Sequence, residues 1–302
     1  MIVVFSGGTG GAKLVQGLNH IVPHENLTVI VNTADDVEWW GLHISPDVDS
    51  ILYALADSLS AERGWGLQDD SFRCLERMAK LGQPSWFSLG DLDLATHLTR
   101  TNLLRTGKTP SAITAELAHR MGIRARVLPM SDDRVATLVE TAHGTLNFQE
   151  YFVRERHQPE VRSIHFDGAD HAKPAPGVLD AIASAEAIVF APSNPVTSIG
   201  PILAVPGMRE ALIGARAPVL AVSPVVAGQV LKGPTAAFME FAGLPCSAAG
   251  VAGYYGELLD GMLADEDVPG LRVLRADTHM HDAPSRASVA ERTLAFAESL
   301  RR

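Results

Sequence analysis

The first fourteen residues, Met1-Ile-Val-Val-Phe-Ser-Gly-Gly-Thr-Gly-Gly-Ala-Lys-Leu14, are the stretch that decides the fold. The uninterrupted apolar run Ile2–Phe5 is typical of a strand buried on both faces. Four glycines follow within five residues, and Ala12 to Leu18 then fit the first turns of a helix. A strand, a glycine-rich turn and a helix in this order present backbone N–H groups at the positive end of the helix. We predict that a phosphate or diphosphate binds there; the alternative is a tight turn that binds no ligand.

Two common nucleotide-binding patterns do not fit this turn. The dinucleotide pattern G-x-G-x-x-G would begin at Gly8 and Gly10, but its third glycine position is Lys13. The Walker pattern requires Gly-Lys-Ser/Thr, whereas Lys13 lies between Ala12 and Leu14. An NAD(P)-dependent oxidoreductase is therefore disfavoured.

Composition limits the class of protein. The chain has 302 residues, of which 46% are apolar and 20% are charged, as in an ordinary globular protein. The formal net charge of −10 argues against a nucleic-acid partner. Two cysteines, Cys74 and Cys246, provide neither a disulfide framework nor a zinc pattern. We find no signal peptide and no apolar stretch that could span a membrane, so we expect a cytoplasmic protein.

Buried strands alternate with helices over most of the chain and predict an α/β fold, a Rossmann-like, doubly wound and mostly parallel sheet. After Ile2–Phe5, the expected strands are 27–31, 124–130, 187–191, 218–222 and 271–275. We assign 1–60 and 171–302 to the nucleotide-binding core and 61–170 to an inserted α+β subdomain. Gly64 to Leu81 is expected to be mostly helical, with Trp65 and Phe72 in the core. Pro192 to Gly200 is expected to be a loop, and Lys232–Pro234 to precede a helix from Thr235.

Polar or acidic segments follow several predicted strands: 7–11, 32–36, 131–134, 193–200 and 223–228. Because the carboxyl ends of parallel strands share one edge of a sheet, these segments could line one crevice. Asp35, Asp36, Asp47 and Asp49 lie within fifteen residues, and Mg²⁺ prefers one or two carboxylates together with substrate phosphates. For Asp35 and Asp36 the alternative is a turn and a helix cap.

A second group of polar residues falls on one predicted helix. Asp91 and Asp93 precede it, and His97 and Arg100, three residues apart, share one of its faces. A histidine in this setting is either structural or functional, and we leave both interpretations open. Lys13, Arg100 or Arg134 could neutralise a diphosphate. These parts together suggest a magnesium-dependent enzyme that acts on a nucleotide diphosphate.

The ordered set of these segments resembles the 2-phospho-L-lactate transferase family of deazaflavin coenzyme (F-420) biosynthesis. The segments that carry the resemblance are 6–14, Asn32-Thr-Ala-Asp-Asp36, Pro46-Asp-Val-Asp49, 89–97, Met130-Ser-Asp-Asp-Arg134, Phe148-Gln-Glu-Tyr151, 191–200 and 223–228. They span nearly the whole chain. The family commonly has a basic residue in the Gly-Asp-x-Asp segment where this chain has Leu92.

The resemblance implies a reaction. The terminal ribityl hydroxyl of 7,8-didemethyl-8-hydroxy-5-deazariboflavin would attack a phosphorus of a GDP-linked donor, releasing GMP and joining the deazaflavin to lactate, enolpyruvate or glycerate. Mg²⁺ would be the cofactor, and a homodimer is expected. Which three-carbon acid the donor carries is left open.

The resemblance also implies roles for individual residues. Those expected to hold donor phosphates are Gly8, Thr9, Gly10, Gly11 and Lys13. Those expected to contact guanosine are Ser193, Asn194, Ser198 and Gly200. The predicted metal ligands are Asp36, Asp47 and Asp49. Asp49 and Asp36 are the predicted catalytic residues, with Asp49 as deazaflavin contact and proton acceptor. Other predicted substrate contacts are Asp91, His97, Arg100 and Arg134. For Trp39, Trp40, Trp86 and Phe148, stacking on the deazaflavin ring and core packing are both open.

One alternative belongs to a different functional class. Nucleotide- or sugar-nucleotide-binding regulatory proteins of the same superfamily share the glycine-rich turn and an Asp-Asp segment. We do not expect them to combine Asp47 and Asp49 with the segments 90–97 and 148–151.

Overall fold

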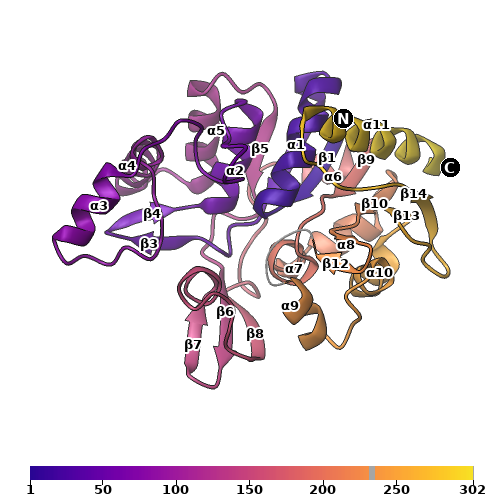
Figure 1. The fold of residues 1–302 in the computed structure, drawn as a ribbon. Coiled ribbons are helices and arrows are strands. Elements are labelled where there is room, and N and C mark those ends of the chain that lie inside the picture. Colours follow the sequence, from indigo (N-terminus) through magenta and orange to yellow (C-terminus); the bar gives the residue numbers. More distant parts are fainter. Residues whose placement is uncertain (231–234, 302) are drawn as a thin grey trace.

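The computed structural model describes residues 1–230 and 235–301, and a seven-stranded parallel sheet lies at its centre (Figure 1). In spatial order the strands are β14 (Arg272–Arg275), β13 (Gly261–Ala264), β10 (Val219–Val222), β9 (Ala187–Phe190), β1 (Ile2–Ser6), β2 (Leu27–Val31) and β5 (Arg126–Pro129). The chain builds outward from β1 to β5 on one side and then from β9 to β14 on the other. This reversal of strand order beside β1 confirms the predicted doubly wound, Rossmann-like fold.

Helices cover both faces of the sheet, as the continuous apolar strands require. Alternate residues of β1 point to opposite faces, so that Val4 packs in one core and Val3 and Phe5 pack in the other. The helices on the Val4 face are α1 (Gly8–Ile21), α2 (Pro46–Leu55), α5 (Pro110–Arg120) and α11 (Ala283–Leu300). Those on the Phe5 face are α6 (Val178–Ala183), α7 (Gly200–Ala204), α8 (Met208–Ile213), α9 (Thr235–Phe241) and α10 (Ala248–Tyr255).

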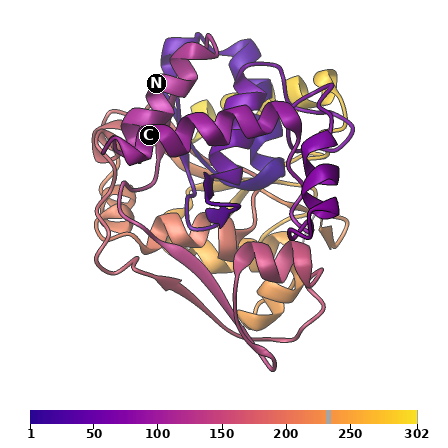
Figure 2. The ribbon, with the colours of Figure 1, turned by 90° about the vertical axis from the view of Figure 1, so that its left-hand side faces the viewer.

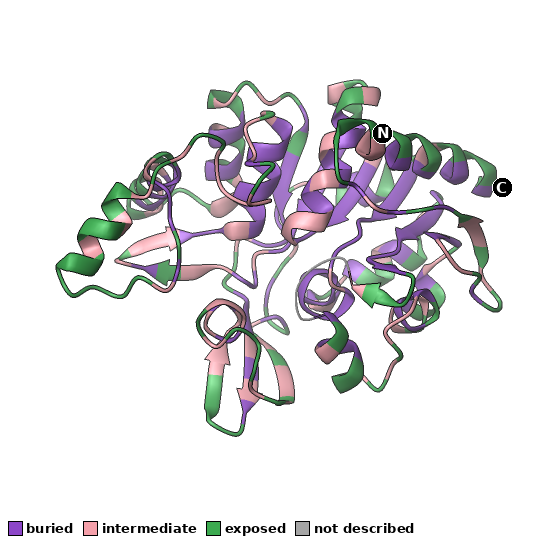
Figure 3. Cartoon of the chain, in the orientation of Figure 1, coloured by how far each residue is buried: buried purple, intermediate pink, exposed green. Residues whose placement is uncertain are grey.

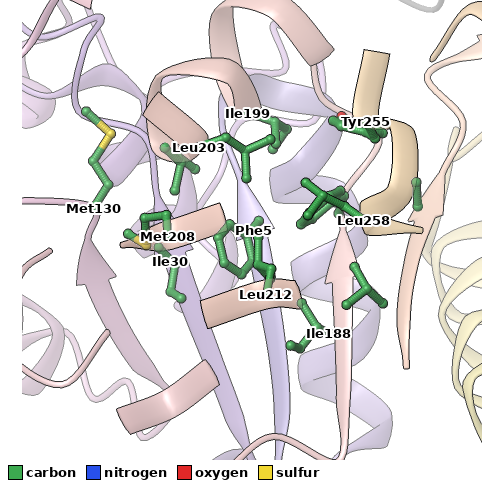
Figure 4. Packing of buried hydrophobic residues seen from close by; sticks show 14 of the residues in the cluster. Phe5, Ile30, Met130, Ile188, Ile199, Leu203, Met208, Leu212, Tyr255 and Leu258 are labelled. Carbon is green, nitrogen blue, oxygen red and sulfur yellow. The ribbon is translucent and has the colours of Figure 1, made fainter. Parts of the chain in front are cut away.

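The core on the Phe5 face holds the loops after β1 and β9 in place. The rings of Phe5 and Phe190 meet edge to face with centroids 5.3 Å apart, and the ring centroids of Phe190 and Tyr255 are 4.9 Å apart. Figure 4 shows Phe5 and Tyr255 among the other buried apolar side chains of this core. Aromatic pairs in this arrangement add about 1 kcal/mol to the stabilisation from burial. The ends of β1 and β9, from which the candidate site is built, are therefore anchored in a packed core.

The remaining elements lie at the carboxyl edge of the sheet and beside it. They are the hairpin β3 (Val37–Trp39) and β4 (Leu42–Ile44), the helices α3 (Arg73–Lys80) and α4 (Asp91–Arg105), and an antiparallel sheet of β7 (Gly144–Asn147), β6 (Ala136–Thr141) and β8 (Val161–Asp167). Figure 2 shows this side of the molecule, with α3 and α4 in purple and the three-stranded sheet in magenta below. A short hairpin joins β11 (Val225–Val226) to β12 (Gln229–Val230). The division at 61–170 stays a prediction, and β5, which lies inside that range, pairs with β2 of the central sheet.

Two local predictions are wrong. Only Arg73–Lys80 of the expected helix 64–81 is helical, and α3 buries none of its residues (Figure 3). Trp65 and Phe72 are half-buried and not in the core. The expected loop at 192–200 contains a π-helical turn, η3 (Pro195–Ile199), and a second π-helical turn, η2 (Glu150–Arg154), follows Phe148. Single 3₁₀ turns occur at η1 (His24–Asn26) and η4 (Gly256–Leu258).

The predicted helix from Thr235 is α9, while Lys232–Pro234 lie outside the described residues. Within residues 1–230 and 235–301, no helix combines the length and the hydropathy that crossing a bilayer requires.

Candidate active site

A cavity of about 370 Å³ opens where the strand order reverses, at the carboxyl ends of β1 and β9. Open α/β sheets bind ligands at this position. We call it the switch-point cavity. Its lining combines two groups of residues, which we call its polar and its apolar ends. The polar group is 7–10, Asp35, Asp47, Ser193, Asn194, Thr197 and Ser198, and the apolar group is Trp65, Phe87, Phe148, Phe152 and Val153. Of the residues predicted to hold phosphates, Gly8, Thr9 and Gly10 line this cavity, whereas Gly11 and Lys13 do not.

The glycines of the turn serve different purposes. Gly8 has φ of +67°, a conformation that side-chain-bearing residues rarely adopt. A Cβ at Gly10 would overlap the carbonyl oxygen of Pro192, so this glycine allows the loop after β9 to lie against α1. Ser193 fixes the contact, because its Oγ accepts from Gly7 N–H at 3.2 Å and donates to Gly7 O at 2.6 Å. Gly10 thus provides close packing between the two loops that line the cavity.

A carboxylate already lies at the positive end of α1. Asp47 is in the first turn of α2, and its Oδ1 accepts from Gly8 N–H at 2.7 Å. Asn32 Nδ2 donates to Asp47 Oδ2 at 3.0 Å and to Asp35 Oδ2 at 3.1 Å, so that one amide group joins two acids. Asp35 Oδ1 is buried and has no hydrogen-bond partner among the described residues. The polar end of the cavity therefore contains two close carboxyl groups with an unused acceptor.

The surroundings of this pair disfavour negative charge. Burial raises the pKa of Asp47 to about 6, against the opposing hydrogen bonds from Asn32 and Gly8. Burial, and then the charge of Asp47, raise the pKa of Asp35 well above its usual value. Such a pair can retain a proton near neutral pH or bind a cation that removes the repulsion. The sequence gives no reason to prefer Asp35 over Asp36, because the two adjacent aspartates fit the same pattern of a turn after a strand.

Asp36 points away from the switch-point cavity. Its Oδ2 accepts from Ser45 Oγ at 2.7 Å and lies 3.0 Å from His43 Nε2. Burial raises its pKa although His43 and Ser45 oppose the shift. Asp36 lines a second cavity of about 500 Å³, together with Arg100 and Arg134. The two adjacent aspartates thus face different cavities.

Asp49 lies in a buried cluster that joins α2 to α4. Both terminal nitrogens of Arg100 donate to its two carboxylate oxygens, the Nη1 contact being 3.0 Å long. His97 lies between two acids, 3.5 Å from Asp49 Oδ2 and 3.3 Å from Asp93 Oδ1, and Tyr53 donates to Asp93 at 2.6 Å. Burial opposes the charge on Arg100, but Asp49 outweighs burial and raises the pKa of Arg100. Asp49 and His97 line neither cavity, and Asp49 is buried as the ion-pair partner of Arg100; its catalytic role stays a prediction.

Two other predicted substrate contacts are on the surface. Asp91 accepts from Ser71 Oγ and from Cys74 N–H at 2.9 Å, and thereby caps α3. Asp70 caps α4 in return, accepting from Leu92 N–H at 2.7 Å. Arg134 is 78% exposed and forms an ion pair with Asp167 at 3.2 Å beside the second cavity. The exposed side chain of Leu92 borders neither cavity.

The loop after β9 brings three of its four predicted residues to the switch-point cavity: Ser193, Asn194 and Ser198. Asn194 caps η3, because its Oδ1 accepts from Val196 N–H at 2.9 Å and from Thr197 N–H at 3.2 Å. Gly200 is buried at the start of α7, where a Cβ would lie 2.6 Å from Tyr254 Oη. It allows packing and does not line the cavity.

The four aromatic residues considered for stacking divide into two groups. Phe148 lines the switch-point cavity. Trp39, Trp40 and Trp86 instead pack on one another beside the β3–β4 hairpin, with the centroids of Trp39 and Trp86 4.6 Å apart. Sequence reasoning missed three further cavity residues, Trp65, Phe87 and Phe152, because an isolated aromatic residue in a sequence is equally compatible with a core position.

The donor set of the switch-point cavity suits a magnesium ion that is shared with a ligand. Among the described residues, no three or more His, Cys, Asp or Glu side chains are grouped as metal ligands. Mg²⁺ in nucleotide sites commonly uses one or two carboxylates and completes its shell with waters and phosphates. The Asp35–Asp47 pair, with one unpartnered buried oxygen, fits this requirement.

Comparison with known proteins relates this geometry to a family. Residues 2–295 match the family described as 2-phospho-L-lactate transferase CofD. The chain belongs to this family. A CofD relative named 2-phospho-L-lactate transferase, from Methanosarcina mazei, is 42% identical over 96% of this chain and 98% of its own. A relative from Streptomyces griseus named phosphoenolpyruvate transferase is 44% identical over 99% of both chains. The chain is accordingly a transferase of the CofD family.

A solved structure supports the fold alone. A UPF0052-family protein from Bacillus halodurans matches 97% of this chain and 98% of its own, with a TM-score of 0.63 and 18% identity. The α/β architecture therefore extends beyond close CofD relatives.

Proposed function

We propose that this CofD-family transferase moves a phospho-carboxylic acid unit from a GDP-linked donor to the ribityl hydroxyl of 7,8-didemethyl-8-hydroxy-5-deazariboflavin in coenzyme F-420 biosynthesis. The hydroxyl oxygen forms a bond to the phosphorus that carries the acid. The bond from this phosphorus to the bridging oxygen breaks, GMP leaves, and the hydroxyl proton passes to a carboxylate. The observation that carries the proposal is a single cavity with phosphate-accessible backbone, two acids and an aromatic end in a member of this family.

Asp35 and Asp47 are better candidates for the chemistry than Asp36 and Asp49. Both line the cavity, whereas Asp36 faces the second cavity and Arg100 holds both oxygens of Asp49. A bound Mg²⁺ would neutralise charge on the diphosphate and the leaving GMP. Asp35 and Asp47 would hold the ion, and a carboxylate oxygen of this pair would accept the hydroxyl proton.

The loop after β9 would bind the guanosine part of the donor. Ser198 and Thr197 provide hydroxyl groups to the cavity lining, Ser193 ties the loop to Gly7, and Asn194 caps the π-helical turn. Thr9 and Gly10 line the cavity next to Asp47, so the donor phosphates would lie between the two loops. The identity of the acid follows neither from these contacts nor from relatives, since lactate- and pyruvate-type names occur at 42% and 44% identity.

The test is a turnover assay with the purified protein, the deazaflavin, Mg²⁺ and each of the lactyl, enolpyruvyl and glyceryl donors. Mass spectrometry should detect GMP and one phosphodiester product. If no donor yields product while GDP or a sugar nucleotide binds, the chain has a regulatory nucleotide-binding function instead. Light scattering would test the expected homodimer in the same preparation.

Magnesium binding can be tested separately from activity. In the absence of substrates, Mg²⁺ should raise the Tm of the parent protein at pH 7.5 and leave that of Asp47→Asn unchanged. Equal Tm shifts in the two proteins would show that Mg²⁺ binds without Asp47.

A further inference from the structure

The apolar end of the switch-point cavity is built from three separate chain segments. Phe148 and Phe152 flank the start of η2, and their stacked rings have centroids 5.7 Å apart at an interplanar angle of 26°. Phe87 comes from the segment before α4, and Trp65 from the loop that a bridge between Leu59 and Leu67 closes. Aromatic side chains from three parts of the chain thus contribute to the lining of one cavity.

Trp65 is fixed in place without being part of the core. The guanidinium of Arg63 lies 5.6 Å from the Trp65 ring and 5.2 Å from the Phe72 ring, and the two rings meet edge to face at 6.2 Å. Arg63 also donates to Leu67 O and so ties the loop together. The indole is half-buried and lines the cavity. An indole supported by a cation and a ring, and bordering a cavity, is preorganised to stack on a planar ligand.

We propose that Trp65 is a specificity-determining residue that stacks on the deazaflavin ring, with the Phe148–Phe152 pair completing the aromatic end. The inference rests on the proposed function and assigns the two ends of one cavity to the two substrates. The ring lies at the Trp65 end, and the ribityl chain extends toward Asp47. A tricyclic deazaflavin presents more ring area for stacking than guanine does.

Guanine is the competing occupant, and the lining argues against it. Phe87, Phe148 and Phe152 contribute no side-chain hydrogen-bonding groups. Of their polar neighbours in the lining, Gln149 already donates to Asp35 O and Ser88 offers one hydroxyl group, so the exocyclic groups of a guanine would find few partners there. The hydroxyl groups of Thr197 and Ser198 in the polar group suit a nucleoside better. The donor and acceptor therefore approach one another from opposite ends, and the acids lie beside the polar one.

Two variants of Trp65 and a matched tryptophan control test the assignment. Trp65→Leu keeps apolar volume and removes the ring, whereas Trp65→Phe keeps a ring. Trp86 is also half-buried but borders neither cavity, so Trp86→Leu controls for loss of an indole. Because stacking of one ring typically contributes about fivefold to 150-fold in affinity, Trp65→Leu should raise KM for the deazaflavin at least about fivefold. KM for the donor should stay within about twofold, Trp65→Phe should recover most of the loss, and Trp86→Leu should match the parent.

An equilibrium titration of deazaflavin fluorescence without donor provides a second measurement. The parent should bind the deazaflavin, and Trp65→Leu should bind it at least about fivefold more weakly. If the parent turns over and Trp65→Leu keeps its acceptor KM, this inference is overturned while the transferase function stands. If only the donor KM rises, the ring at Trp65 is guanine and the assignment is reversed. If the parent protein neither forms product nor binds deazaflavin, both the proposed function and the role of Trp65 are wrong.

Discussion

Replacing Asp47 by asparagine removes a buried charge while keeping the size of the side chain. Asp47 is 7% exposed, and its pKa is raised from 3.8 to about 6 in the folded protein. Each pKa unit corresponds to about 1.4 kcal/mol, so the ionised carboxylate costs the folded state about 3 kcal/mol at pH 7.5. The folded state of the parent therefore binds the Asp47 proton more tightly than the unfolded chain does.

The sign of the pH dependence follows from that difference. Because the folded pKa is the higher one, the stability that Asp47 contributes is present below pH 3.8 and is lost as the pH rises through 6. In Asp47→Asn the new carbonyl oxygen can still accept from Gly8, but the new NH₂ group faces Asn32. One hydrogen bond worth about 1 kcal/mol is therefore lost. We expect the variant to be more stable than the parent by about 2 kcal/mol at pH 7.5 and by less at pH 5.

Urea unfolding at the two pH values, in buffer without divalent cations, measures this difference. Asp69→Asn is the control, because Asp69 is exposed and forms no ion pair among the described residues, and its stability difference from the parent should not depend on pH. An Asp47→Asn protein that is less stable than the parent at pH 7.5, or whose difference does not change with pH, would refute the reasoning. Turnover of the stable variant should fall at least about 100-fold, as expected for loss of a proton acceptor or metal ligand.

Three further variants separate structural from catalytic roles. Asp49→Asn should lower the free energy of unfolding by about 3–5 kcal/mol in urea titrations, because Arg100 would keep a buried charge without a counterion; an unchanged stability would contradict the buried ion pair. Gly10→Ala should lower stability by about 1–3 kcal/mol and weaken GDP binding in calorimetry, since its Cβ overlaps the Pro192 carbonyl; unchanged values for both would show that the loops have room. Asp91→Ala should lower Tm through loss of the α3 cap and leave kcat/KM unchanged, and a raised KM would restore Asp91 as a substrate contact.

The sheet could be predicted from the sequence because its strands are buried on both faces and are therefore continuous apolar runs. The loop around Trp65 could not, because its conformation depends on distant contacts. Gly64 and Gly66 adopt positive φ there, and the Arg63 side chain holds Trp65 against Phe72. The helical pattern of residues 64–81 contains no information about these contacts, so it predicts a helix where the structure has a loop.

The sequence predicted which segments of the chain lie at the site, but not which of their side chains face the cavity. Asn32–Asp36 does reach the cavity edge, yet Asp35 and Asp36 face opposite sides, and sequence cannot say which of two adjacent acids points inward. Asp49 fits a metal-ligand pattern as well as Asp47 does. Only the fold reveals that Arg100, 51 residues away, holds Asp49. A pairing over such a distance leaves no local signal in a single chain.

The hydrogen bond between Gly8 and Asp47 also changes the role that we assign to the glycine-rich turn. The sequence predicts that this turn offers its backbone N–H groups to phosphate, but Asp47 already accepts from the first N–H of α1. A donor phosphate and the Asp47 carboxylate are therefore both drawn to one positive helix end and repel each other there. Under the proposed function, a divalent cation between them would be attracted to both, so that the donor and the metal would favour each other's binding. Under the proposed function Asp47 would link the phosphate site to the metal site, and burial raises the pKa of this carboxylate.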